Sequence, residues 1–117
     1  MGVAEMSIIA EAVDGVYGRS AAGLRASLEH PLEGCWKPLA RSETDVAGRI
    51  SEWADLSLDR GLYRIVFDSD QYFVGLGVVA AYPEISVTFR MQDEDDVCKV
   101  QVLLAPHSYS TYFGTAG

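Results

Sequence analysis

This sequence contains few cysteine and histidine side chains, which are common nucleophiles, metal ligands and proton carriers near neutral pH. The chain of 117 residues has two cysteines, Cys35 and Cys98, and two histidines, His30 and His107. The cysteines lack the close spacing of a zinc site, and no cluster of His, Cys, Asp and Glu has metal-ligand spacing. We therefore expect no metal ion and no other cofactor.

The C-terminal stretch "PHSYSTYFGTAG" is unusual for the end of a chain. It combines hydroxyl groups with three aromatic side chains, Tyr109, Tyr112 and Phe113, where a solvated tail would carry charges. Terminal residues are usually loose unless a neighbouring element holds them. The apolar run "VQVLLAP" comes directly before, so we expect "YSTYFG" to form a final strand that pairs with this run.

Composition limits the classes of partner. Seventeen Asp and Glu residues against nine Lys and Arg give a net charge of −8, which leaves too few cations for a surface that binds nucleic acid or an anionic membrane. The N-terminal residues lack the pattern of a signal peptide, and no apolar window is long enough to span a membrane. We expect one cytoplasmic domain over residues 1–117.

The hydrophobic pattern predicts an all-β protein with one short helix. Apolar and polar residues alternate in several runs of strand length separated by turn residues. Pro38 should place its strand at a sheet edge or a bulge, Asp14 should cap a turn through its own backbone, and Ser69 should cap the helix, which ends at Gly75 or Gly77. The expected strands cover residues 7–13, 24–30, 61–68, 84–92, 97–105 and 109–114, with an acidic turn at 93–96. A further strand, interrupted by Pro38, follows a turn within residues 31–45.

Four segments in order along the chain resemble one known family. "VQVLLAPHSYSTYFGT" resembles the closing signature of the transthyretin and 5-hydroxyisourate hydrolase family, and "GLYRIVFDSDQYF" and "AYPEISVTF" are similar to two of its central segments. "DGVYGRSAAGLRASL" looks like its first loop and second strand. The resemblance implies a transthyretin-like (prealbumin-like) β-sandwich of two four-stranded sheets, and a homotetramer (a dimer of dimers) with a ligand channel between dimers.

In the hydrolase branch, the resemblance implies a site in that channel where water opens 5-hydroxyisourate. The family's catalytic set is a histidine on the first strand, an arginine in a Gly-Arg turn, a histidine on the penultimate strand and a terminal Tyr-Arg-Gly-Ser. This sequence keeps the Gly-Arg turn as Gly48 and Arg49. Glu11 of "EAVD" falls where the first-strand histidine is expected, and Lys99 of "VCKV" where the penultimate-strand histidine is expected.

The C-terminal motif is altered as well. Phe113 falls at the family's terminal arginine and Thr115 at its final serine, and neither His30 nor His107 falls at a catalytic position. Imidazole can take and give a proton near neutral pH, which lysine and glutamate do not do unless their pKa values are strongly shifted. We therefore expect inefficient hydrolysis of 5-hydroxyisourate.

If the family geometry holds, Glu11, Arg49 and Lys99 converge on one channel, with Tyr112, Phe113 and Thr115 as substrate-binding residues. In the favoured interpretation the chain is a divergent enzyme acting on a small cyclic or carbonyl-containing molecule, by hydrolysis or by repurposed cyclisation or lyase chemistry in specialised metabolism. Glu11 is then the base, Lys99 the acid or oxyanion partner, and Arg49 positions the substrate. In the alternative, the channel carries an amphipathic ligand without chemistry.

Each of these residues also has a purely structural interpretation. Lys99 could form a surface ion pair with the neighbouring acidic residues, Glu11 could be a solvated strand residue, and Arg49 could belong only to a turn. Tyr112 and Phe113 could serve packing alone. Cys98 should be a small buried filler, because no histidine lies at an expected position to activate it.

Overall fold

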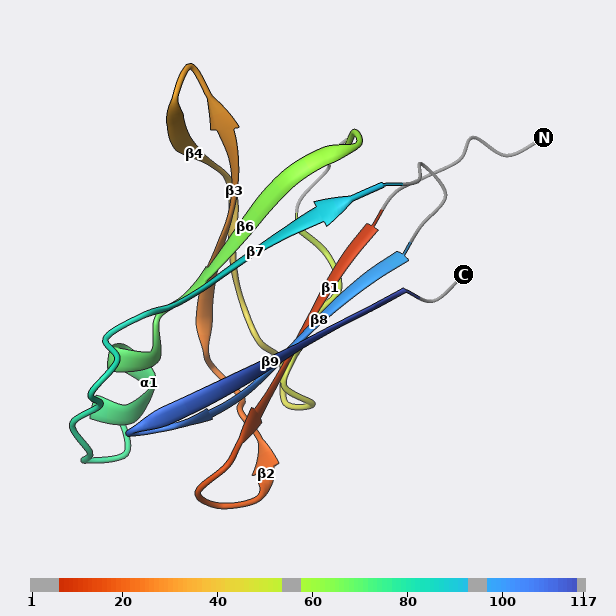
Figure 1. The fold of residues 1–117 in the computed structure, drawn as a ribbon. Helices are drawn as coiled ribbons and strands as arrows, with labels where there is room; N and C mark the ends of the chain where they lie inside the picture. The colour runs from red at the N-terminus through yellow and green to blue at the C-terminus, as the bar shows by residue number, and fades with distance from the viewer. Residues whose placement is uncertain (1–6, 54–57, 93–96, 116–117) are drawn as a thin grey trace.

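The computed structural model describes residues 7–53, 58–92 and 97–115, which form two stacked β-sheets and one short helix (Figure 1). Sheet A has the strand order β2-β1-β8-β9, and β5 adds to the side of β1. Sheet B has the order β4-β3-β6-β7. The strands of sheet A are β1 (Ser7–Asp14), β2 (Arg19–Ser20), β5 (Arg49–Ile50), β8 (Val97–Ala105) and β9 (Ser108–Thr115); those of sheet B are β3 (Arg25–Leu32), β4 (Cys35–Glu43), β6 (Gly61–Phe67) and β7 (Ile85–Met91).

The alternating pattern in the sequence becomes alternating burial in the sheets. In β1, β7 and β8 every second residue is buried between the sheets, because successive side chains of a strand point to opposite faces. The largest fully buried side chains come from both sheets and from the helix. The predicted strands are thus confirmed, and two two-residue strands, β2 and β5, add to sheet A where only turns were expected.

Pro38 lies where its missing N–H is tolerated. Its strand β4 is an edge strand of sheet B, and the register with β3 shifts between Leu28, which pairs with Ala40, and Glu29, which pairs with Pro38. The shift leaves Leu39 as an extra residue in β4. The prediction of an edge or a bulge is confirmed, since the structure has both.

Helix α1 (Ser69–Val74) follows β6 directly, and its first residue corrects one prediction. Ser69 is not the N-cap: its hydroxyl donates to the carbonyl of Tyr82 at 2.7 Å. Asp68 is the N-cap, and its Oδ1 accepts from the backbone N–H of Gln71 at 3.0 Å. The helix ends before Gly75, as predicted. The described residues contain no helix of the length and apolar character needed to cross a membrane.

Asp14 ends β1 and ties it to the turn and to the helix. The carboxylate is fully buried, and its Oδ1 accepts from the backbone N–H groups of Val16 at 2.8 Å and Tyr17 at 3.1 Å. This confirms the predicted turn. Its Oδ2 accepts a 2.7 Å hydrogen bond from the hydroxyl of Tyr72 in α1. Burial, followed by the hydrogen bond and the charge of Asp14, raises the pKa of Tyr72, so its hydroxyl stays a donor.

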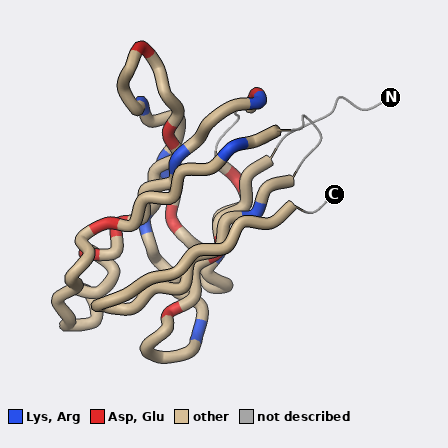
Figure 2. The backbone as a smooth tube through the Cα atoms, in the orientation of Figure 1, with Lys and Arg blue, Asp and Glu red and all other residues tan. Residues whose placement is uncertain are grey.

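The final strand is paired, as the sequence suggested. β9 runs antiparallel to β8 from Ser108 opposite Ala105 to Thr115 opposite Cys98. β9 is an edge strand of sheet A and carries no charged residue along its length (Figure 2). The acidic turn predicted at 93–96 lies outside the described residues.

Candidate functional site

An ion-paired cluster of three side chains lies on the outer face of sheet A, the face turned away from sheet B. Oε1 of Glu11 accepts from Arg49 twice, from Nη2 at 2.8 Å and from Nε at 3.1 Å. Nζ of Lys99 lies 3.1 Å from the same oxygen. The structure therefore brings together the three residues that the sequence proposed as catalytic.

Exposure differs within this cluster. The Glu11 side chain is only 15% exposed, whereas those of Arg49 and Lys99 are 50% and 44% exposed. Burial alone would raise the pKa of Glu11, but the hydrogen bonds and positive charges of Lys99 and Arg49 outweigh it, so the pKa of this carboxyl lies below its ordinary value. Glu11 is thus an anion at neutral pH, held between two cations that remain open to solvent.

The backbone around Gly48 places Arg49 beside β1. Oδ1 of Asp45 accepts from the backbone N–H groups of Ala47 and Arg49, at 2.9 and 3.0 Å. Gly48 has a φ of +74°, and a Cβ there would lie 2.4 Å from the carbonyl oxygen of Ala12. Its own carbonyl accepts from the N–H of Ala12 at 2.7 Å. Only glycine fits this approach, which sets Arg49 opposite Glu11 in the β1–β5 register.

Lys99 reaches Glu11 because β1 and β8 are parallel neighbours. In their register Lys99 pairs with Ile9, and Glu11 pairs with Gln101. The ammonium group therefore approaches the carboxylate diagonally, from a residue pair two positions along the strands, with Ala10 and Val100 paired in between. Both strands send alternate side chains to the outer face, and this pattern places Glu11, Lys99 and Gln101 together.

Gln101 and Tyr112 extend the cluster across the sheet. The registers place Arg49 opposite Glu11, Glu11 opposite Gln101, and Gln101 opposite Tyr112, so the four residues form a row over β5, β1, β8 and β9. Next to the row is a hollow of about 330 Å³. It is lined by Val13, Gln101, Leu103, Ser110, Thr111 and Tyr112.

Sequence reasoning had missed Gln101 and the apolar residues of this hollow. The signal was present in "VCKVQVLLA", because a period of two puts Lys99, Gln101 and Leu103 on the same face. Together the cluster and the hollow form a surface with charge at one end and apolar and hydroxyl groups at the other.

Two of the predicted substrate-binding residues lie on the other face. Phe113 pairs with Val100 and Thr115 pairs with Cys98, and both partners are buried between the sheets. The Phe113 ring lies 5.7 Å from the ring of Phe89 in sheet B, measured between centroids. Strand alternation thus separates Phe113 and Thr115 from the Glu11 cluster and leaves Tyr112 beside it.

The histidines lie away from the cluster. His30 is in β3 of sheet B, and His107 is exposed in the turn between β8 and β9. Cys98 is buried, in agreement with its expected role as a small filler. Within residues 7–53, 58–92 and 97–115, no group of three or more His, Cys, Asp and Glu side chains is placed to hold a metal ion.

A second ion pair, on the outer face of sheet B, provides a comparison. Nε of Arg64 donates to Oε1 of Glu29 at 2.9 Å, and the guanidinium lies 4.7 Å from the ring centroid of Trp36. Here one carboxylate meets one cation, which is also covered by an aromatic ring. The Glu11 cluster differs because two cations share a single carboxylate oxygen and both stay half exposed.

The proteins similar to this chain include several 5-hydroxyisourate hydrolases. The chain is 33% identical over 104 residues to the 5-hydroxyisourate hydrolase of Salmonella typhi, a match that covers 88% of this chain and 76% of the relative. It is 32% identical over 106 residues to the 5-hydroxyisourate hydrolase of Mus musculus, covering 88% and 90% of the two chains.

Solved structures agree on the fold. Transthyretin from sea bream, solved in complex with thyroxine, superposes with a TM-score of 0.87 at 23% identity, over 93% of this chain and 95% of that one. The 5-hydroxyisourate hydrolase of Klebsiella pneumoniae gives a TM-score of 0.79 at 26% identity, over 92% and 98%. The fold is therefore the transthyretin-like sandwich, and residues 8–114 match the sequence profile of the HIUase/Transthyretin family. This chain belongs to that family.

Proposed function

We propose that the chain is a divergent enzyme of the 5-hydroxyisourate hydrolase type that acts on a small cyclic or carbonyl-containing molecule. The observation that carries this proposal is the sharing of one oxygen of Glu11 by Arg49 and Lys99, at 2.8 and 3.1 Å. Two half-exposed cations held this close form a site for an oxygen that is negative or becomes negative during a reaction.

The lowered pKa of Glu11 changes the division of roles that the sequence suggested. A carboxylate whose ionised form is stabilised by two cations is a weaker base than an ordinary glutamate. We therefore propose that Lys99 and Arg49 stabilise negative charge on the substrate oxygen, and that Glu11 holds these two cations in place. The arrangement suits attack by water on a polarised carbonyl carbon, followed by cleavage of the ring C–N or C–O bond at that carbon. The proton released by the water reaches the leaving ring atom through solvent.

Efficient turnover of 5-hydroxyisourate is not part of this proposal. The cluster contains no imidazole, and His30 and His107 lie elsewhere in the fold. Without a group that takes and gives protons near neutral pH, acceleration must come from charge stabilisation and positioning alone. We expect a substrate whose carbonyl is reactive enough to need only these.

We also propose that the site lies in a channel between copies of the chain, arranged as a tetramer. Support comes from β9, a long edge strand without charges, and from the half-exposed Leu103 on the outer face of sheet A. Exposed strand edges without charges tend to pair with other strands. A second copy facing sheet A would enclose the cluster and strengthen its electrostatic effects. We place this assembly in the cytoplasm.

The experiment is a kinetic comparison of variants on a defined set of substrates. The purified protein is given freshly made 5-hydroxyisourate and a panel of lactones, lactams and cyclic ureides, and ring opening is followed by ultraviolet absorbance. We expect slow decay of 5-hydroxyisourate, close to the uncatalysed rate, and turnover of a panel member that Lys99→Ala and Glu11→Gln abolish. The control is Glu29→Gln, which breaks the ion pair on sheet B.

Two outcomes would contradict the proposal. Fast, saturable turnover of 5-hydroxyisourate would show that the ancestral reaction survives without the histidines. Saturable binding of an amphipathic anion, lost in Lys99→Ala and without turnover of any panel member, would favour the carrier function. That alternative rests on the surface described above, which has two cations at one end and Val13, Leu103 and Tyr112 at the other.

A further inference from the structure

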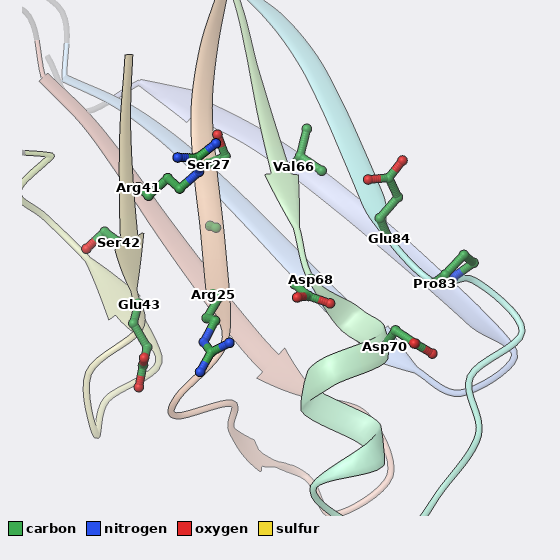
Figure 3. Close-up of a pocket in the computed structure, with 11 residues that line it drawn as sticks. Arg25, Ser27, Arg41, Ser42, Glu43, Val66, Asp68, Asp70, Pro83 and Glu84 are labelled. Carbon is green, nitrogen blue, oxygen red and sulfur yellow. The ribbon is translucent and has the colours of Figure 1, made fainter. Parts of the chain in front are cut away.

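A second hollow, larger than the one on sheet A, lies on the outer face of sheet B. Its volume is about 770 Å³, which is in the range of small-molecule sites. It lies between β4 and β3 on one side and the start of α1 and the segment before β7 on the other (Figure 3). The lining residues are Arg25, Ala26, Ser27, Arg41, Ser42, Glu43, Val66, Asp68, Asp70, Pro83 and Glu84.

The hollow exists because the middle of the sheet carries small side chains. Ser27 in β3 and Val66 in β6 pair with each other in the register, and both are partly buried. Arg41 pairs with Ser27 from the other side and rises from the edge strand β4. Short side chains thus form the floor of this hollow, and longer charged side chains form its walls. We call the whole hollow the sheet B groove.

The two walls of the sheet B groove carry different charges. Arg25 and Arg41 lie on the β3–β4 side, and Asp68, Asp70 and Glu84 lie on the side of α1 and β7 (Figure 3). Glu43, opposite Arg25 in the register, adds one carboxylate to the arginine wall. The lining therefore has two cations and four anions, and between described residues no ion pair joins the two walls.

This separation is not a general property of the sheet B face. Two residue pairs further along, at the next pair on the same face, Arg64 and Glu29 face each other directly and form an ion pair. In the sheet B groove, the floor of Ser27 and Val66 lies between the opposite charges instead. A molecule lying across this floor would meet an anionic wall with one end and the arginines with the other.

We propose that the sheet B groove binds a short amphoteric molecule, with its amine at Asp68, Asp70 and Glu84 and its carboxylate at Arg25 and Arg41. Strands are about 4.8 Å apart, so the distance from β3 or β4 to β7 is about 10–14 Å. An extended tripeptide spans about 10–11 Å. A tripeptide with free ends therefore has the charges and the length that match the two walls. This site is separate from the Glu11 cluster and does not depend on the function proposed there.

The test uses trialanine and its two capped forms as probes. Backbone amide signals of Ser27 and Val66 are followed by NMR as each peptide is added to the full chain. We expect saturable shifts with trialanine and about tenfold weaker binding of N-acetyl-trialanine, which lacks the amine. Trialanine amide, which lacks the carboxylate, should weaken less, because four carboxylates line the groove and Glu43 partly offsets the arginines.

Variants assign the ends of the peptide to the walls. Glu84→Gln should weaken trialanine binding, so that the variant binds trialanine and N-acetyl-trialanine with more similar affinities. Arg41→Gln should likewise weaken trialanine binding, so that the variant binds trialanine and trialanine amide with more similar affinities. Arg90→Gln is the control, because Arg90 is an exposed residue of β7 outside the groove lining. Glu11→Gln should leave binding unchanged, which separates this site from the other.

Two results would overturn the proposal. One is the absence of saturable shifts at Ser27 and Val66 with trialanine up to about 10 mM, a concentration above the weakest affinities expected of a specific site. The other is equal binding of the free and both capped peptides, which would mean that neither terminal charge is recognised.

Discussion

Glu11 is the residue on which the two cations of the site depend. Its single oxygen Oε1 is the partner of Arg49 and Lys99, and no other side chain in the described cluster offers a carboxylate. Glu11→Gln would leave two like charges side by side without an anion between them. Because both cations are half exposed, water screens their repulsion, and the effect on folding stability should stay below about 1 kcal/mol. We expect Glu11→Gln to reduce catalytic turnover instead.

The pH dependence of stability follows from the pKa of Glu11. Its folded-state pKa lies below the unfolded value of about 4.5, so the ion pairs stabilise the fold fully above that value. Their contribution is lost as the pH falls through the lowered folded-state pKa. We expect the Glu11 pKa, measured by carbon NMR of the carboxyl, to lie below the ordinary value and to rise in Lys99→Ala. An unchanged value in that variant would contradict the ion pair.

Tyr72 should matter for stability because of its contact with a buried carboxylate. Tyr72→Phe removes the 2.7 Å hydrogen bond to Asp14 and leaves Oδ2 without that donor inside the protein. The expected loss is about 1–3 kcal/mol in the free energy of unfolding, measured with urea. Tyr109→Phe is the control, since Tyr109 is 41% exposed. Equal losses of unfolding free energy in the two variants would show that the hydrogen bond to Asp14 stabilises the fold no more than an exposed tyrosine hydroxyl does.

At the scale of elements, the short strand β5 depends on Gly48. Gly48→Ala requires both a strained φ and a shift of backbone, because the added Cβ would meet the Ala12 carbonyl at 2.4 Å. We expect a loss of at least about 1–3 kcal/mol, together with displacement of Arg49 and lower activity. Gly34→Ala is a matched control: its φ is +80°, and nothing lies within 4 Å of the added Cβ. If Gly34→Ala costs as much, φ strain alone explains the effect and the contact with β1 does not.

Strand alternation made most elements predictable from the sequence. The pattern in "EISVTFRMQ" and "GLYRIVFD" matches the burial of β7 and β6, and Pro38 marked the edge strand correctly. The sequence pattern did not predict which residues of β9 face the site, because Tyr112 and Phe113 are both aromatic and lie on opposite faces of the sheet. Only the pairing with β8 decides which of them joins the site.

The charged cluster was predictable in part. The family resemblance indicated Glu11, Arg49 and Lys99, but their contacts depend on β1 and β8 lying in parallel and on a two-residue strand. Such pairings join segments distant in the chain, and local patterns do not specify them. The helix start is a smaller case: Asp68 and Ser69 both have side chains suited to capping, and the contact of Ser69 with Tyr82 decided between them.

At the scale of the whole molecule, the proposed tetramer predicts which face tolerates a charge. Leu103→Glu places a carboxylate on the outer face of sheet A, where a facing copy would bury it, so we expect smaller assemblies in native mass spectrometry. Leu62→Glu is the control on the outer face of sheet B, where the leucine is 39% exposed. A tetramer that survives Leu103→Glu would argue against a channel lined by sheet A.

The parallel pairing of β1 and β8 also sets the order in which a newly made chain can reach its final form. All four strands of sheet B lie within residues 25–91. In sheet A, by contrast, β1 cannot pair with β8 until residues 97–105 have been translated. Contacts between distant segments form slowly because the intervening chain must first be ordered. Glu11 is therefore translated well before Lys99, and the two side chains can meet only after β8 has emerged. A chain halted before β8 lacks Lys99 and the strand that joins β1 to β9, so its site is incomplete even though Glu11 and Arg49 are already present.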